Sequence, residues 1–103
     1  MITLYIRYTL DPAKLADFAA YARALRRPIE RCGGTSVAYF LPTKLAGPTN
    51  IALGLISFPD LARYEQYREK LAIDAEGVEC LQRVEAAGCI LIEDRSFLRP
   101  VET

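Results

Sequence analysis

The sequence predicts an α+β protein with a four-stranded antiparallel sheet in the ferredoxin-like order βαββ(α)αβ. Three observations support this: strict alternation of apolar residues over the first ten positions, long segments with helical spacing, and an almost continuously apolar stretch over 50–58. Short connections between successive elements place the helices on one face of the sheet. A chain of 103 residues has room for a single domain, expected over 1–103.

Residues 2–10 form the first predicted strand, because apolar and polar side chains alternate with a period of two. One side carries Ile2, Leu4, Ile6, Tyr8 and Leu10. The other side carries Thr3, Tyr5, Arg7 and Thr9. The apolar side is expected to face the helices, which leaves Tyr5 and Arg7 on the opposite face.

The helices are predicted from their boundary residues as well as from their spacing. Asp11-Pro12 is a typical helix start, and Gly33-Gly34 ends a helix over about 12–32, in which Pro28 should kink or convert the last turn. Pro59-Asp60 opens a second helix. Asp74 is expected to cap a third, which runs to about Ala87.

Three further strands are predicted over 35–42, 50–58 and 89–98, with a loop over 43–50. In the last strand we assign Ile90 and Ile92 to the helix side, so Glu93 and Arg95 should project from the opposite face. On that open face we expect an apolar patch of Val37, Tyr39, Leu41, Leu91 and Phe97. Such a patch on a small domain usually marks a partner surface. We therefore predict a homodimer in which two sheets pack face to face as an α+β barrel.

The composition excludes several classes of function. Thirteen basic and thirteen acidic residues cancel, which argues against nucleic acid or an anionic membrane as partner. No histidine is present and the three cysteines lack metal-ligand spacing, so no metal and no cofactor are expected. A strand pattern directly after Met1, with no signal peptide or apolar span, predicts a cytoplasmic protein.

Five polar residues are candidates for ligand binding: Tyr5, Arg7, Tyr39, Glu93 and Arg95. We expect them to point into the barrel, with Arg7, Glu93 and Arg95 in one charged cluster on adjacent strands. An arginine there could anchor a small organic acid or an enol, with a tyrosine as hydrogen-bond donor. The same cluster could instead be a buried ion-pair network with only a structural role. No catalytic residue can be assigned from the sequence.

Several segments resemble the NIPSNAP family over essentially the whole chain. They are Met1–Tyr8, Gly33-Gly34-Thr35 leading to Tyr39–Pro42, Ser57–Ala62 with Tyr64 and Tyr67-Arg68, and Arg95–Pro100, the most specific of these motifs. The resemblance implies a ferredoxin-like fold and a homodimeric α+β barrel, as in the wider superfamily of antibiotic-biosynthesis monooxygenases. It implies no particular catalytic residue.

Two classes of function remain open. The chain could be a non-catalytic small-molecule-binding or assembly module, which is the interpretation we favour from the sequence. It could instead be a cofactor-independent small-molecule enzyme like those monooxygenases. An enclosed pocket inside the barrel, with arginine and tyrosine side chains pointing into it, would favour the enzyme, and a solid barrel interior would favour the module.

Overall fold

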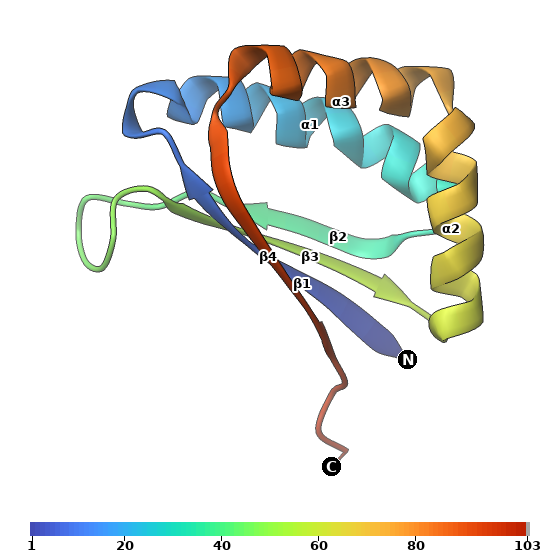
Figure 1. The fold of residues 1–103 in the computed structure, drawn as a ribbon. Coiled ribbons are helices and arrows are strands. Elements are labelled where there is room, and N and C mark those ends of the chain that lie inside the picture. Colours follow the sequence, from blue (N-terminus) through green and yellow to red (C-terminus); the bar gives the residue numbers. More distant parts are fainter. Residues whose placement is uncertain (103) are drawn as a thin grey trace.

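The structure, a computed structural model, describes residues 1–102 and confirms the predicted α+β fold (Figure 1). The elements in chain order are β1 (Ile2–Leu10), a 3-10 turn (Pro12–Lys14), α1 (Leu15–Cys32), β2 (Thr35–Phe40), β3 (Ile51–Phe58), α2 (Leu61–Ile73), α3 (Ala75–Ala87) and β4 (Ile90–Leu98). The sheet is antiparallel throughout, in the order β2-β3-β1-β4. This is the ferredoxin-like arrangement, with β4 at one edge.

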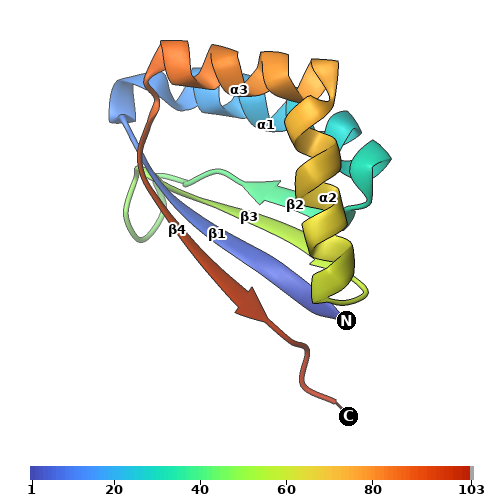
Figure 2. The ribbon, with the colours of Figure 1, turned by 45° about the vertical axis from the view of Figure 1, so that its right-hand side comes forward.

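The three helices cover one face of the sheet and leave the other face open (Figures 1 and 2). In both views α1 and α3 lie side by side, and α2 runs from the end of β3 away from the sheet to the start of α3. The core lies between the two layers and includes Leu4, Tyr8, Phe18, Ile29 and Phe58, each at most 2% exposed. As predicted, the alternating apolar side chains of β1 pack against the helices.

Helix boundaries follow the predicted capping chemistry. Asp60 accepts a hydrogen bond from the backbone N–H of Arg63, and Asp74 accepts one from the N–H of Gly77. Gly88 ends α3 in the left-handed conformation at φ 64°. Pro28 lies inside α1, which continues to Cys32.

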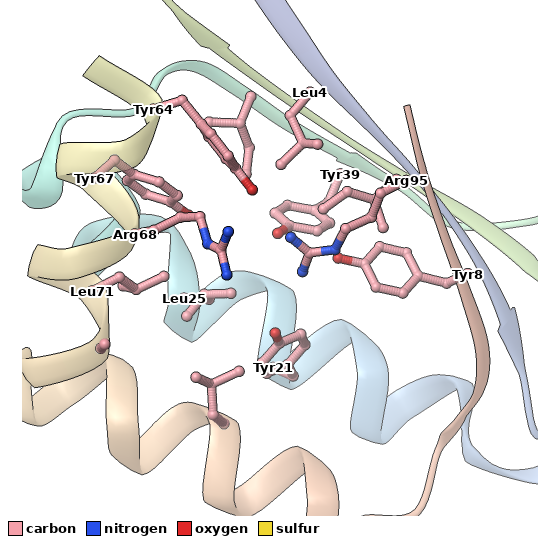
Figure 3. A pocket seen from close by; sticks show the side chains of 14 residues that line it. Leu4, Tyr8, Tyr21, Leu25, Tyr39, Tyr64, Tyr67, Arg68, Leu71 and Arg95 are labelled. Carbon is pink, nitrogen blue, oxygen red and sulfur yellow. The ribbon is translucent and has the colours of Figure 1, made fainter. Parts of the chain in front are cut away.

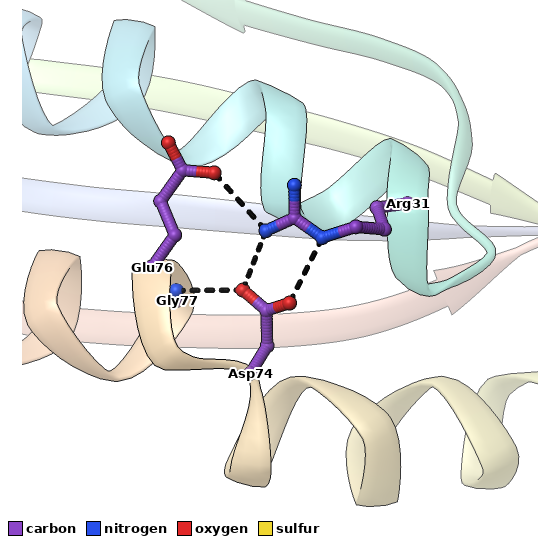
Figure 4. A network of polar contacts seen from close by, with 4 residues as sticks. All are labelled: Arg31, Asp74, Glu76 and Gly77. Atoms are coloured by element: carbon purple, nitrogen blue, oxygen red, sulfur yellow. Dashed lines mark hydrogen bonds and ion pairs between the residues drawn. The ribbon is translucent and has the colours of Figure 1, made fainter.

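An ion-pair network fixes the junction of α2 and α3 against the end of α1 (Figure 4). Arg31 donates through Nε and Nη2 to the two carboxylate oxygens of Asp74, at 2.9 and 2.7 Å, and through Nη2 to Glu76 at 3.0 Å. These hydrogen bonds raise the pKa of Arg31 and lower the pKa of Asp74. The network thereby holds α2 in position beside the sheet.

The β4 strand contains a bulge that changes which side chains face the helices. Leu10 pairs with Ile90 but Thr9 pairs with Ile92, so Leu91 is the extra residue. Beyond it, Tyr8 pairs with Glu93 and Ile6 pairs with Arg95. Cross-strand partners project from the same face. The prediction that Glu93 and Arg95 lie on the open face is therefore wrong, because one extra residue reverses the alternation.

A second bulge lies at the start of β2, where Thr35 pairs with Ser57 and Ala38 with Leu55. Ser36 takes a positive φ of 49° in this bulge. Val37 is buried in the core, and Tyr39 pairs with Gly54 on the helix side. The predicted open-face patch is thus also wrong for Val37 and Tyr39.

The open face nevertheless carries apolar side chains, from other positions than those predicted. Its exposed members include Phe40, Ile92 and Leu98. Phe97, which we expected on this face, instead contacts Tyr64 of α2, with ring centroids 4.8 Å apart. Leu91 is the bulge residue and is exposed at the sheet edge.

Candidate functional site

A cavity of about 500 Å³ lies between the helix-facing side of the sheet and the helices (Figure 3). The sheet contributes Tyr8, Tyr39 and Arg95, α1 contributes Tyr21 and Leu25, and α2 contributes Tyr64, Tyr67 and Arg68. Its remaining walls are aliphatic and include Leu4, Ile6, Ile56, Leu71 and Leu81. The size and the mixture of apolar walls with a few polar groups are typical of small-molecule sites.

Four of the five tyrosines that line the cavity keep their hydroxyl groups protonated and so can act as hydrogen-bond donors. Burial is the main cause that raises the pKa of Tyr8, Tyr21, Tyr39 and Tyr67. Two neighbours partly oppose the rise in the pKa of Tyr39. The Tyr8 hydroxyl is a hydrogen-bond donor to it, and Arg95 contributes a positive charge. The cavity is thus lined with neutral phenols that can donate to an oxygen of a ligand.

Tyr39 reaches the cavity because β3 has no side chain beneath it. A Cβ atom placed on Gly54 would lie 2.8 Å from Cε1 of the Tyr39 ring, closer than real atoms approach. The glycine therefore leaves room for the Tyr39 ring over the sheet, where its centroid lies 6.3 Å from those of Phe18 and Tyr8.

Arg95 enters the cavity from β4 as one half of an ion pair. Its Nε donates to Glu93 Oε2 at 2.7 Å, and the two side chains are 51% and 32% exposed. Desolvation is the largest single influence on the pKa of Arg95 and lowers it. The hydrogen bond to Glu93 and other contributions together outweigh this effect, so the pKa of Arg95 is raised. Arg95 is thus a charged donor whose own charge is balanced by its neighbour.

Arg68 enters from the opposite wall. It lies one helical turn after Tyr64, with its guanidinium carbon 5.9 Å from the centre of the Tyr64 ring. Figure 3 shows Arg68 and Arg95 turning their guanidinium groups toward each other across the cavity. No carboxylate within residues 1–102 forms an ion pair with Arg68.

A second cavity of about 360 Å³ adjoins the first along α3 and β4. The two share Tyr21 and Leu81 in their walls, and Glu93 lines the second cavity whereas Arg95 lines the first. The ion pair between these two residues therefore lies at the boundary between the cavities.

The structure brings together only part of the predicted site. Tyr39 and Arg95 line the cavity, and Glu93 lies beside it. Tyr5 and Arg7 lie on the open face, where Arg7 is exposed opposite Asp94. The predicted cluster of Arg7 with Glu93 and Arg95 is therefore wrong, because the β4 bulge moves the last two to the other side of the sheet.

Most of the tyrosines and one arginine of the cavity were not predicted as site residues from the sequence. Tyr64, Tyr67 and Arg68 recur at three- and four-residue spacing and so share one face of α2. That spacing is equally typical of core packing, and it does not reveal what the helix faces.

Two further properties bear on the class of protein. Among residues 1–102, no three or more Cys, Asp or Glu side chains gather where they could hold a metal ion. None of the helices in this part of the chain has both the length and the apolar character needed to cross a membrane.

Fold and cavity together define a two-layer α+β protein with a small-molecule-sized pocket between sheet and helices. The NIPSNAP family model matches residues 4–103, and the chain belongs to the NIPSNAP family. The resemblance noted from the sequence is thereby confirmed. No curated protein matches the chain.

Solved structures with this fold include NIPSNAP family members and an antibiotic biosynthesis monooxygenase. A NIPSNAP family protein of Agrobacterium tumefaciens is similar at a TM-score of 0.78 with 21% identity, covering 98% of this chain and 93% of that one. An uncharacterized NIPSNAP domain protein of Burkholderia xenovorans gives 0.78 with 17% identity, at coverages of 98% and 95%. An antibiotic biosynthesis monooxygenase gives 0.73 with 11% identity, at 99% and 100%. These similarities establish the fold, and no activity follows from them.

Proposed function

We propose that this NIPSNAP protein binds a small organic acid or an enol in the cavity between sheet and helices. The observation that carries the proposal is the lining of that cavity, where protonated tyrosines and two arginines converge within apolar walls. Neutral phenols donate hydrogen bonds to carbonyl or enolate oxygens, and guanidinium groups bind carboxylates. The aliphatic and aromatic walls would hold the carbon skeleton.

Native mass spectrometry of freshly purified protein tests this proposal. The expected result is a non-covalent adduct of a small molecule, which is lost on denaturation. Leu81→Trp should remove the adduct, because Leu81 lines the cavity and is 38% exposed, so an indole can enter without disturbing the core. Gln82→Trp, on the exposed neighbouring position of α3, is the matched control and should retain it. An adduct that survives Leu81→Trp would place the ligand elsewhere.

We further propose that the protein acts as a homodimer through the open face of the sheet, which would form an α+β barrel. Phe40, Ile92 and Leu98 are 52%, 54% and 47% exposed on this face. Along β4 every residue after Ile90 is exposed, although the strand is nine residues long. Exposed apolar area of this kind is typical of a partner surface.

The three cysteines are buried and form no disulfide. Free thiols are typical of a reducing compartment, which supports a location such as the cytoplasm.

A second candidate function is a cofactor-independent enzyme that converts the bound acid or enol. The cavity favours it because arginine and tyrosine side chains converge in it, as in a site that stabilises a developing oxyanion. Mass spectrometry of the ligand after incubation separates the candidates. A binding protein returns the ligand unchanged, whereas an enzyme returns a product of different mass.

A further inference from the structure

We infer that the cavity selects ligands by their charge and accepts a planar monoanion, held between Arg68 and Arg95, because Glu93 cancels one of the two positive charges. The inference rests on the proposed function, since it specifies the ligand of the same cavity. It makes Arg68 the anchor of the ligand and Glu93 the residue that sets the permitted charge.

The two arginines oppose each other across the cavity. They come from α2 and β4, on opposite walls, and their guanidinium groups point toward each other (Figure 3). Two positive charges that face each other repel, so the space between them favours a negative charge. Each guanidinium group also presents several N–H donors in one plane, which suits a carboxylate or an enolate.

The charged residues at the cavity determine its net charge. Arg68 and Arg95 are the charged residues that line the cavity, and Glu93 is bonded to Arg95 at 2.7 Å. Arg68 has no ion-pair partner in the described part of the chain. Tyr8, Tyr21, Tyr39 and Tyr67 add no charge, because burial raises the pKa of their hydroxyl groups. Glu85 lines only the neighbouring cavity and forms no ion pair with either arginine. The sum is one positive charge.

The aromatic lining of the cavity determines which shape of ligand fits. The rings of Tyr8 and Tyr39 line one side of the cavity with their centroids 6.3 Å apart, and Tyr64 and Tyr67 line another side near Arg68. Aromatic side chains stack on flat rings or conjugated systems. A planar aromatic or enolic acid therefore fits better than a flexible aliphatic acid.

Three probes that share one ring system test the inference: 2-naphthoate as monoanion, 2-naphthalenemethanol as neutral analogue, and naphthalene-2,3-dicarboxylate as dianion. Calorimetric titration at fixed salt gives their affinities for the wild-type protein. We expect 2-naphthoate to bind about tenfold or more tighter than the neutral analogue, the effect of one hydrogen bond to a charged group. The dianion should bind more weakly than the monoanion.

Four variants identify the residues responsible. Arg68→Met should weaken 2-naphthoate about tenfold or more and leave the neutral analogue almost unchanged, whereas Arg68→Lys should retain the preference for the anion. Arg63→Met is the matched control, since Arg63 is exposed on α2 and does not line the cavity. Glu93→Gln should raise the affinity for the dianion about tenfold relative to the monoanion.

The possible failures are distinguishable. Equal affinity of the wild-type protein for 2-naphthoate and 2-naphthalenemethanol would overturn the charge selection and leave the proposed small-molecule binding intact. The charge selection would likewise be overturned if Arg68→Met and Arg63→Met behave alike, or if Glu93→Gln leaves the preference between monoanion and dianion unchanged. Absence of binding for all three probes would overturn the proposed function and the inference with it. Circular dichroism on every variant confirms that the fold is retained.

Discussion

Tyr39 lies directly across from Gly54 in the β2–β3 pair, and its ring occupies the space that a side chain on Gly54 would fill. This relationship places a partly buried phenol in the wall of the cavity. It also makes the position of the ring sensitive to a single methyl group.

Gly54→Ala should therefore disturb both stability and binding. The added Cβ would meet Cε1 of Tyr39 at 2.8 Å, so the ring must shift, at a cost of about 1–3 kcal/mol in unfolding free energy. Chemical denaturation measures this cost. Combining Gly54→Ala with Tyr39→Ala removes the obstacle, so the double variant should be less destabilised than the sum of the two single changes. Additive effects would show that the ring and the glycine are independent.

The open face should support self-association. Light scattering of the eluting wild-type protein should give twice the chain mass of 11.5 kDa. Phe40→Glu and Leu98→Glu each place a charge in the exposed apolar face and should yield a folded monomer. Leu45→Glu changes a 93% exposed residue in the loop after β2 and should leave the dimer intact. A monomeric wild-type protein at micromolar concentration would contradict the barrel.

Stability should fall in alkaline solution because of the buried tyrosines. Burial is the main cause that raises the pKa of Tyr8, Tyr21 and Tyr67. A tyrosine in the unfolded chain has a pKa of about 10. Above that pH the unfolded chain loses protons that the folded chain keeps, so unfolding becomes more favourable as pH rises. The free energy of unfolding should drop by about 1.4 kcal/mol per pH unit for each such group.

Absorbance of tyrosinate and circular dichroism, recorded together, check this prediction. The buried tyrosines should ionise only as ellipticity is lost. Ionisation of all six tyrosines in a protein that keeps its full ellipticity would refute it.

The Arg31–Asp74 pair should contribute stability that is lost in acid. Hydrogen bonds from Arg31 and from the Gly77 N–H hold the pKa of Asp74 below its ordinary value. A carboxyl group of this kind stabilises the fold above its unfolded pKa of about 3.9, and the contribution disappears as pH falls through the lower, folded value. Asp74→Asn should thus be destabilised at neutral pH, and its difference from the wild type should shrink in acid.

Asp60→Asn provides the comparison for this effect. Asp60 caps α2 through the Arg63 N–H but has no ion-pair partner within residues 1–102, so its replacement should cost less than that of Asp74. Thermal unfolding over a pH series measures both. An equal loss for the two variants at neutral pH would show that the arginine contributes nothing.

The fold could be predicted from the sequence because its signals are local and mutually consistent. Alternation in β1, the caps at Asp60 and Asp74, and the stop at Gly88 each determine one element. The bulges could not be predicted. Residues 89–92 are four consecutive apolar residues, so no break in the pattern marks Leu91 as the extra one. Ser36 likewise adopts a positive φ, a conformation usually supplied by glycine.

The candidate site was predicted only in part for the same reason. Arg95 and Tyr39 were correctly chosen as polar residues on the sheet, but the bulges decide which face they occupy. Arg68 was missed because an exposed arginine on an amphipathic helix is ordinary in sequence. Its significance comes from Arg95 on the opposite wall, a relationship between residues that only the tertiary structure brings together.

A titration of leucine-methyl-labelled protein with 2-naphthoate, followed by NMR, tests the central claim most directly. The cavity and the open face both contain leucines, so one spectrum reports on both sides of the sheet. We predict saturable shift changes for Leu25, Leu71 and Leu81 in the cavity, with little change for Leu53, Leu55 and Leu98 on the open face. Changes confined to the open-face leucines, or no saturable change at all, would contradict a ligand site between the sheet and the helices.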